Sequence, residues 1–210
     1  LFQRFWRGLK NNCDLTSHAK RDVTFTLDEL HEFQLAMLGV SSKAARRNAA
    51  WAGFSFWGVR RGSEGVNALV KHVEACPSGL RVLVPSQKNK RRPQFCHIPS
   101  RPQDGVLCPV RLISEWRSIA IRDYDLGADD PLFCCTQGAR AGLRCSTQDL
   151  RQAVSKFYRD SDVSLHSFRK GGTQFYTLVA MVSDDATQAQ GGWADRRVME
   201  LIYKHARSHI

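Results

Sequence analysis

The hydrophobic pattern of this chain changes its period at Pro77-Ser78-Gly79, and this change limits the folds open to it. Apolar residues before this point recur at helical spacing, whereas residues 80–84 and 95–98 alternate between apolar and other side chains. The alternating runs flank a polar, basic stretch, residues 87–92, which predicts a β-hairpin with a cationic tip. We therefore expect a mainly α-helical fold with a small antiparallel β-sheet, an α+β domain.

Several segments carry helix signals. Thr26 and Glu29 have the spacing of a capping box. Pro109 suits a first helical turn, and Ser146 suits an N-cap. The helices expected from these signals and from apolar spacing are residues 27–38, 42–56, 63–76, 109–116, 147–157, 166–179 and 198–203.

The charge of the chain is strongly positive. Thirty-one Lys and Arg against 20 Asp and Glu give a net charge of +11. Such a charge favours a polyanionic partner, because cations that neutralise phosphates release counterions. Nucleic acid is the leading candidate, and the alternative is a basic protein without such a partner. The residues expected to contact DNA are Lys43, Arg46, Arg47, Arg60, Lys90, Arg91, Arg92 and Lys170.

Composition and the chain ends bound the organisation. No apolar run approaches the roughly 20 residues that cross a bilayer, so we expect no membrane partner. Residues 1–23 mix aromatic and cationic side chains without periodicity, and we interpret them as a connector from a missing preceding domain. The seven Cys are odd in number and lack C-x-x-C spacing. They predict buried thiols in a reducing, intracellular setting, with neither disulfides nor a zinc site.

Groups suited to phosphodiester chemistry follow one another near the carboxyl end. His166 and Arg169 are three residues apart, so on a helix both can reach one phosphate. An imidazole can transfer a proton, and a guanidinium can hold two oxygens in a fork. Gly191-Gly192-Trp193 and Tyr203 come next, and a phenol can attack phosphorus when neighbours help to remove its proton. Taken alone, Tyr203 would fit a packing or surface role.

The run Leu165-His166-Ser167-Phe168-Arg169-Lys170-Gly171-Gly172 resembles the second signature box of the tyrosine recombinases, the phage-integrase-like site-specific DNA recombinases. The residues of this run are similar to those of the crypton and DIRS-like recombinases of eukaryotic mobile elements. The first arginine of the family stands in a Gly-x-Arg-x-Ser-Glu turn, which Arg61, Ser63 and Glu64 match. Arg60 is the neighbour that is out of register.

The resemblance implies a role for each matched residue. Tyr203 would attack the scissile phosphate and form a 3′-phosphotyrosyl link. Arg61 and Arg169 would clamp that phosphate and stabilise the charge of the transition state. His166 would assist proton movement. Trp193, at a position that is His or Trp in the family, would position the phosphate, because an indole cannot transfer a proton at neutral pH.

A catalytic lysine of the family lies on a β-hairpin tip, which assigns Lys88 as the general acid, with Lys90 as the alternative. For either lysine, a solvated turn that only contacts phosphates is the competing interpretation. The chain departs from the family in spacing, because Tyr203 lies ten residues after Trp193, one more than the family pattern leads us to expect.

As a whole, the resemblance implies the tyrosine recombinase catalytic-domain fold over residues 24–210, after a missing core-binding domain. It implies a DNA strand transferase that acts on double-stranded DNA without metal or nucleotide, as four protomers around two duplexes. The alternatives are a type IB topoisomerase or telomere resolvase and an inactive, domesticated DNA-binding module. A metal-dependent nuclease would need a carboxylate cluster, whereas Asp129-Asp130 and Asp184-Asp185 have the pattern of turns.

Overall fold

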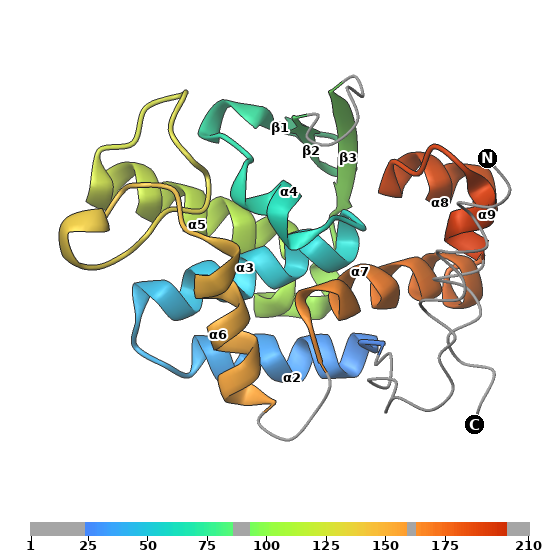
Figure 1. Cartoon of the computed structure of the whole chain (residues 1–210), viewed down its shortest axis with the longest axis horizontal. Coiled ribbons are helices and arrows are strands. Elements are labelled where there is room, and N and C mark those ends of the chain that lie inside the picture. Colours follow the sequence, from blue (N-terminus) through green and yellow to red (C-terminus); the bar gives the residue numbers. More distant parts are fainter. Residues whose placement is uncertain (1–23, 86–92, 159–162, 201–210) are drawn as a thin grey trace, which may run out of the picture.

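The computed structural model describes residues 24–85, 93–158 and 163–200. Its α-helices are α2 (Leu27–Leu38), α3 (Lys43–Trp57), α4 (Gly62–Val66), α5 (Pro109–Tyr124), α6 (Thr147–Phe157), α7 (Leu165–Gln174), α8 (Asp184–Gly191) and α9 (Arg196–Met199). Its strands are β1 (Val73–Cys76), β2 (Gly79–Val84) and β3 (Gln94–Pro99). Shorter turns are Val70–His72, Pro102–Leu107 and Gly138–Arg140, which are 3-10 helical, and Phe175–Val179, which is π-helical. The predicted mainly α fold with a small antiparallel sheet is confirmed (Figure 1).

Local signals place several helix starts where the sequence predicts them. The Thr26 N–H donates to Glu29 Oε2 (2.6 Å) and the Glu29 N–H donates to Thr26 Oγ1 (3.2 Å), which completes the capping box before α2. Ser146 caps α6 by accepting from the Asp149 N–H (3.2 Å). Pro109 is the first residue of α5. These caps satisfy backbone donors that a helix start leaves without partners.

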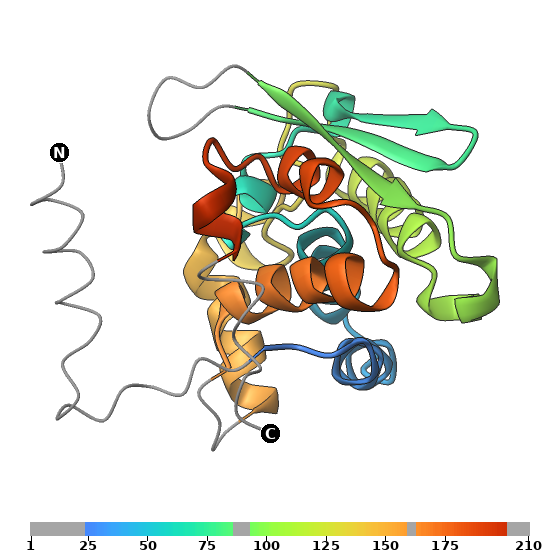
Figure 2. The same ribbon diagram turned by 90° about the vertical axis from the view of Figure 1, so that its right-hand side faces the viewer.

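The expected helix over residues 63–76 is wrong. Helix α4 ends at Val66, and Val73–Cys76 forms strand β1, which pairs with β2 in antiparallel register with Val73 opposite Val82. Strand β2 pairs in turn with β3, so the sheet order is β1-β2-β3 (Figure 2). The apolar spacing in this segment suits either element, and pairing with β2 decides between them.

Helix α3 lies at the centre of the core, between α2 and the sheet (Figure 1). Its side chains Trp51, Phe54 and Trp57 are at most 1% exposed. Helix α7 crosses α3 at close range, because a Cβ on Gly172 would lie 1.9 Å from the carbonyl oxygen of Phe56. A residue with any side chain at position 172 would push the two helices apart. This contact fixes α7, and with it His166 and Arg169, relative to the end of α3.

Candidate active site

Helix α3 ends in a hydrogen-bonded turn that sets the direction of the two arginines after it. The Val59 N–H donates to Phe56 O (3.1 Å), and the Arg60 N–H donates to Ser55 O (3.0 Å), the two bonds of a Schellman motif. The left-handed residue of this motif is usually glycine, but here it is Val59, with a φ of 52°. A left-handed conformation costs a residue with a side chain roughly 1–2 kcal/mol. The packing around Val59 must therefore hold it in place.

Arg61 stands at the start of α4 and turns back onto Glu64. Its N–H donates to Glu64 Oε2 (3.0 Å), and its Nη1 pairs with Glu64 Oε1 (3.0 Å). The side chain of Arg61 is 49% exposed, against 14% for Glu64. Arg61 is thus oriented by a carboxylate while about half of its side chain remains accessible to an anion.

Arg169 reaches the same carboxylate from α7. Its Nη1 lies 3.5 Å from Glu64 Oε2, and its Nη2 donates to the carbonyl oxygen of Gly191 (3.0 Å). Its guanidinium carbon lies 4.2 Å from the centre of the Trp193 ring. Two guanidinium groups from separate helices therefore converge on one carboxylate, and together they carry the charge needed to hold phosphate oxygens. The sequence pattern placed Glu64 in the motif of Arg61 but did not indicate that Glu64 contacts both arginines.

Trp193 packs on this arginine from the chain that follows α8. The residue is 6% exposed, and its contact with Arg169 is a cation–π interaction, which typically contributes about 0.5–2 kcal/mol. A Cβ on Gly191 would lie 1.8 Å from a ring carbon of Trp193, so the indole fills the space over that glycine. The main-chain N–H of Trp193 donates to the carbonyl oxygen of Gln188 (3.2 Å), and Gln188 Nε2 donates to the carbonyl oxygen of Trp193 (3.0 Å). The ring is thus held against Arg169 by its own backbone.

Gln190 fixes α8 to the outer edge of β3. Its Oε1 accepts from the His97 N–H (3.0 Å), and its Nε2 donates to the carbonyl oxygens of His97 and Trp57 (2.9 Å to the latter). On the same edge, two positions from His97, the carbonyl oxygen of Phe95 accepts from Arg60 Nη2 (3.3 Å). The arginine turn, β3 and α8 therefore keep fixed relative positions. Sequence analysis missed Gln190, because a lone glutamine carries no motif.

His166 lies on α7 one helical turn before Arg169, as the sequence pattern predicts. Its side chain is partly exposed, whereas Arg169 is fully buried. The His166 N–H donates to Oγ of Ser164 (3.2 Å), the N-cap of the helix. The structure therefore brings Arg61, Arg169 and Trp193 into one network and places His166 on the same helix as Arg169.

Comparisons with known proteins separate sequence from structure. No family model matches the sequence, and no curated protein matches it. The structure, however, is similar to XerH site-specific recombinase bound to its difH substrate, with a TM-score of 0.66 and 18% identity over 89% of this chain and 51% of that chain. The fold is that of a tyrosine recombinase catalytic domain.

Two further structures share this recombinase fold. XerA recombinase has a TM-score of 0.64 and 16% identity over 87% of this chain and 60% of that chain. The Tn1549 transposon integrase in complex with transposon right end DNA has a TM-score of 0.59 and 13% identity over 90% of this chain and 64% of that chain. The likeness confirms the predicted fold. The chain spans between about half and two thirds of the length of these proteins.

Three of the four tyrosines of this recombinase-fold chain are held away from nucleophilic chemistry. Each hydroxyl donates to a main-chain carbonyl oxygen: Tyr124 to Thr136 (3.1 Å), Tyr158 to Glu29 (3.1 Å) and Tyr176 to Trp57 (2.9 Å). Burial raises the pKa of all three phenols. A phenol with a raised pKa is a poor nucleophile at neutral pH. The fourth tyrosine, Tyr203, lies outside the described residues.

The remaining predicted residues of the recombinase site also lie outside the described residues: Lys88, Lys90, Arg91 and Arg92. The structure gives the elements that flank them. Strands β2 and β3 are antiparallel neighbours on either side of residues 86–92, which confirms the hairpin. Helix α9 ends at Met199, four positions before Tyr203. The catalytic roles of Lys88, Lys90 and Tyr203 stay predictions.

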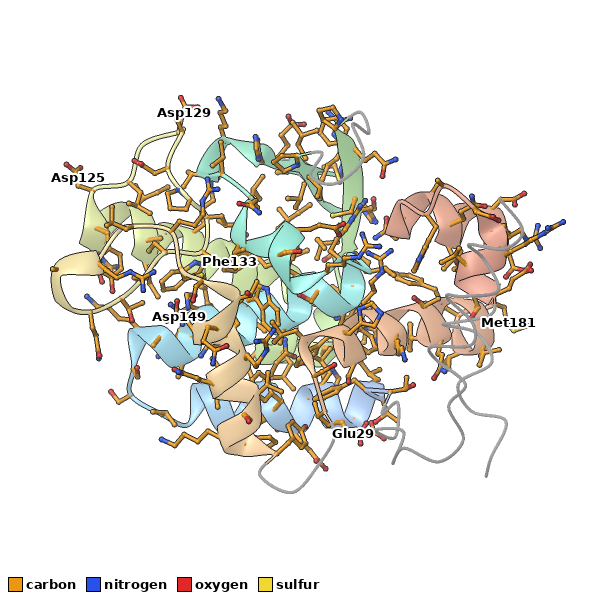
Figure 3. The ribbon with its side chains drawn as sticks, in the orientation of Figure 1. Glu29, Asp125, Asp129, Phe133, Asp149 and Met181 are labelled. Carbon is orange, nitrogen blue, oxygen red and sulfur yellow. The ribbon has the colours of Figure 1, made fainter. Side chains whose placement is uncertain are left out.

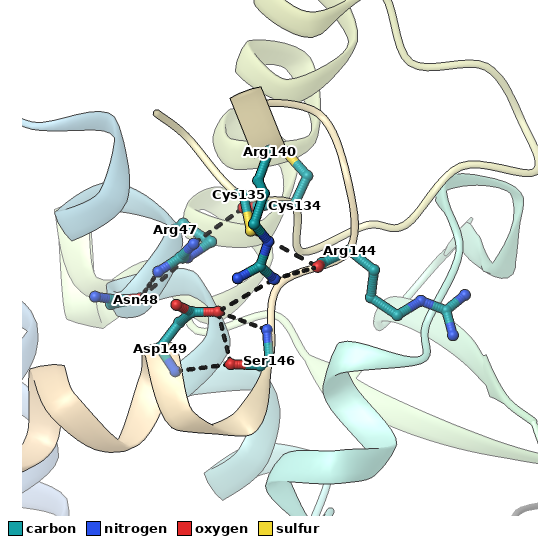
Figure 4. Close-up of polar contacts among 8 residues, drawn as sticks. All are labelled: Arg47, Asn48, Cys134, Cys135, Arg140, Arg144, Ser146 and Asp149. Carbon is teal, nitrogen blue, oxygen red and sulfur yellow. Dashed lines mark hydrogen bonds and ion pairs between the residues drawn. The ribbon is translucent and has the colours of Figure 1, made fainter. Parts of the chain in front are cut away.

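The structure divides the predicted DNA contacts on α3 of the recombinase fold. Lys43 and Arg46 are exposed, and Lys43 pairs with Asp123 (2.7 Å). Arg47, by contrast, is not on the surface: its side chain is 5% exposed and its guanidinium bonds inside the protein to the Cys134 carbonyl oxygen (3.0 Å) (Figure 4). Successive helical residues point in different directions, and a basic pair in the sequence does not say which member faces inward.

Arg60 and Lys170 are also buried, at 2% and 1% exposure. Neither forms part of an exposed DNA-contact surface, and Arg60 instead holds the edge of β3. Charged side chains are seldom fully buried, so their burial could not be expected from the sequence.

The cysteines of the described chain are thiols, and all but Cys76 are buried. Burial raises the pKa of Cys134 to about 11 and that of Cys145 to about 12, although the charge of Arg47 opposes the shift. Such thiols are inert at neutral pH. Within residues 24–85, 93–158 and 163–200, no three His, Cys, Asp or Glu side chains are grouped to hold a metal ion. No helix in these ranges has the length and apolar character of a membrane span.

Proposed function

We propose that this chain is the catalytic domain of a site-specific DNA recombinase that cleaves and rejoins double-stranded DNA through a 3′-phosphotyrosyl intermediate. The observation that carries the proposal is the convergence of Arg61 and Arg169 on Glu64, with Trp193 packed on Arg169, within a fold that solved recombinases share. The hydrogen bonds and raised pKa values of the other three tyrosines support Tyr203 as the nucleophile.

In the proposed reaction, the phenolic oxygen of Tyr203 attacks the scissile phosphorus and the bond to the 5′ oxygen breaks. Arg61 and Arg169 hold the nonbridging oxygens and stabilise the charge that develops on them. His166 assists removal of the phenolic proton, and Lys88 gives a proton to the departing 5′ oxygen. The tyrosyl ester conserves the energy of the broken bond. A 5′ hydroxyl can therefore reseal the strand without ATP or a metal ion.

Further residues of the proposed enzyme support catalysis, contact DNA or limit access to the site. Lys90 is the alternative general acid, and Trp193 orients Arg169. Lys43 and Arg46 contribute to phosphate contacts on the exposed face of α3. Because Arg169 is fully buried, DNA must open that side of the site to reach it. We further propose that the whole protein works intracellularly on DNA, as a homotetramer that holds two duplexes.

A covalent-trapping experiment tests this function. The protein is incubated with a library of nicked duplexes of randomised sequence, in which the nick lets a short product diffuse away and traps the enzyme on DNA. We expect a denaturant-resistant protein–DNA adduct that Tyr203→Phe abolishes. Tyr176→Phe is the matched control and should keep the adduct, because that hydroxyl is bonded to a main-chain carbonyl. Equal loss in both variants, or no adduct with any duplex while binding persists, would favour an inactive DNA-binding module.

Two further readouts separate the remaining alternatives. Joining between two duplexes identifies a recombinase, whereas relaxation of supercoiled plasmid without joining identifies a type IB topoisomerase. Adduct formation should survive chelation by EDTA, because no proposed step uses a metal ion. Arg169→Lys should slow cleavage by roughly 100-fold or more, because lysine cannot reproduce a two-pronged contact with phosphate oxygens.

A further inference from the structure

The turn that ends α3 contains a residue that its backbone geometry does not favour. Val59 is left-handed, with a φ of 52°, although Gly58 directly precedes it and takes an ordinary right-handed conformation. The two hydrogen bonds of the turn involve only main-chain atoms and would form equally well with glycine at position 59. A strained residue persists where its surroundings hold it, and strained residues often lie at functional sites. The side chain of Val59 is therefore the feature to explain.

That side chain is fully buried in a small apolar cluster apart from the main core. The cluster consists of Val59, Trp193 and Met199, and Tyr176 packs against it. Val59 is adjacent to the two arginines of the turn, and Met199 is the last residue of α9. The cluster thus joins the segment that presents Arg61 to the segment that leads toward Tyr203.

Helix α9 has few other attachments of comparable strength. Met199 is its buried residue. Arg196 pairs with Asp184 (2.8 Å), Asp185 (3.2 Å) and Glu200 (2.7 Å), but its side chain is 48% exposed. Exposed ion pairs contribute little, because water and salt screen them. We therefore expect the packing of Met199 in the cluster with Val59 and Trp193 to contribute more to the attachment of α9 than the ion pairs of Arg196 do.

We propose that Val59 is a positioning residue, whose side chain couples the arginine turn to α9, the last described helix before Tyr203 in the sequence, and that full catalytic activity requires this coupling. The catalytic consequence rests on the proposed function, whereas the coupling itself does not. A valine at this left-handed position then has a physical reason, because packing in the cluster with Trp193 and Met199 offsets the steric strain of the conformation.

Two substitutions at position 59 separate this account from a purely local one. Val59→Ala and Val59→Gly both remove the methyl groups that enter the cluster, but Val59→Gly also relieves the backbone. We expect amide hydrogen exchange at residues 196–200 to speed up roughly tenfold in both variants, through local opening of α9, while exchange in α3 and β2 stays unchanged. Val198→Ala, on the exposed side of the same helix, is the matched control and should leave exchange unaffected. Wild-type exchange at 196–200 in both Val59 variants overturns the proposal.

The contact can also be tested from its other side. Met199→Ala should raise exchange at residues 196–200 to a similar extent, and Val59→Ala combined with Met199→Ala should be little worse than either change alone. Fully additive effects would mean that the two side chains act independently, which contradicts a coupling between them.

Trapping on nicked DNA supplies the catalytic arm. Val59→Ala and Val59→Gly should bind DNA as the wild type does but form the covalent adduct roughly ten- to a hundredfold more slowly, the size of effect that a small misplacement of reacting groups produces. Faster exchange with an unchanged rate of adduct formation overturns the positioning role. If the wild type forms no adduct at all, the proposed function fails, while the exchange data still decide whether Val59 couples the arginine turn to α9.

Discussion

The body of the domain, comprising α2, α3, α5, α7 and the sheet, and its α8–α9 corner, residues 184–200, are held by different forces. The body has one continuous apolar core, in which Trp51, Phe54 and Trp116 are at most 1% exposed. The corner has a three-residue cluster, the hydrogen bonds of Gln190 and exposed ion pairs. Figure 3 labels Phe133, which is fully buried in this core, and Met181, which is 79% exposed and precedes the corner in the sequence.

This difference teaches how the candidate site is assembled. Arg169 stands on α7 of the body and Arg61 stands at the start of α4, shortly after α3, whereas Trp193 comes from the corner. Segments with few buried apolar contacts open locally at lower free energy than the core does. One wall of the site therefore belongs to the main core, and we expect the other wall to open locally at a lower free energy than unfolding of the domain.

The largest expected effect tests the rigid wall. Gly172→Ala places a Cβ 1.9 Å from the Phe56 carbonyl oxygen, so α7 must move away from α3. We expect the free energy of unfolding to fall by about 3 kcal/mol or more, or the chain not to fold. Urea denaturation measures this. Gly39→Ala is the control, because its nearest neighbour is 3.4 Å away, and it should change stability by less than about 0.5 kcal/mol. Similar losses of stability in the two variants would mean that the close contact between α3 and α7 does not limit the stability of the body.

A smaller and more local effect is expected in the corner. Gln190→Leu removes the side-chain partner of the His97 N–H and of the His97 carbonyl oxygen, and one of the two donors to the Trp57 carbonyl oxygen, which keeps the Tyr176 hydroxyl. We expect a local cost of about 2–3 kcal/mol, because polar groups at a partly buried contact lose their bonds. Amide exchange over residues 184–193 should report a larger loss of free energy than the change in the free energy of global unfolding. Gln190→Glu keeps the acceptor for the His97 N–H but sets a carboxylate oxygen against two carbonyl oxygens, so it should not restore wild-type exchange. If urea denaturation shows that the free energy of global unfolding falls as much as the local value does, the corner unfolds together with the body.

Acid provides a third test, confined to α6. Burial tends to raise the pKa of Asp149, but hydrogen bonds from the Ser146 N–H and hydroxyl and the charge of Arg140 outweigh it, so this pKa is lowered (Figure 4). A lowered folded-state pKa adds stability that is complete above the unfolded value of about 3.9 and is lost as pH falls through the folded value. Asp149→Asn should therefore lose about 1 kcal/mol at neutral pH and depend less on pH below about 4.

Thermal unfolding monitored between about pH 2 and pH 7 measures the Asp149 effect. Exchange in the α8–α9 corner should not respond to this substitution, because α6 lies in another part of the molecule (Figure 1). Parallel loss of protection in both regions would mean that the corner follows the body as one cooperative unit.

The smallest effect is expected at the surface of the corner. Arg196→Ala removes the exposed pairs with Asp184, Asp185 and Glu200. Exchange in α8 should rise slightly in dilute buffer, and the difference from wild type should vanish at about 1 M salt, where such pairs are screened. A difference that persists in high salt would mean that the ion pairs of Arg196 stabilise the corner more than the Val59 cluster does.

Local rules account for what the sequence predicted correctly. The capping box of Thr26 and Glu29 depends on a three-residue spacing, and so does the placement of His166 and Arg169 on one helix. The β2–β3 hairpin follows from alternation around a polar tip. Each of these features is decided within a short stretch of chain.

Tertiary packing decided what the sequence could not. The inward turn of Arg47, the use of Glu64 by both arginines and the strand at residues 73–76 each depend on segments far away in the sequence. Gln190 reads as an ordinary helical residue until α8 meets β3. Val59 gives no local sign that it is left-handed, because sequence rules reserve that conformation for glycine.

The side chains along the outer edge of β3 have a consequence for assembly. Gln190 and Arg60 occupy the backbone groups of His97 and Phe95 that a further strand would need. The sheet therefore cannot grow at that edge by annexing an extended segment from another molecule, a common route to fibrous aggregates. Copies of this domain that gather must therefore meet elsewhere than along β3.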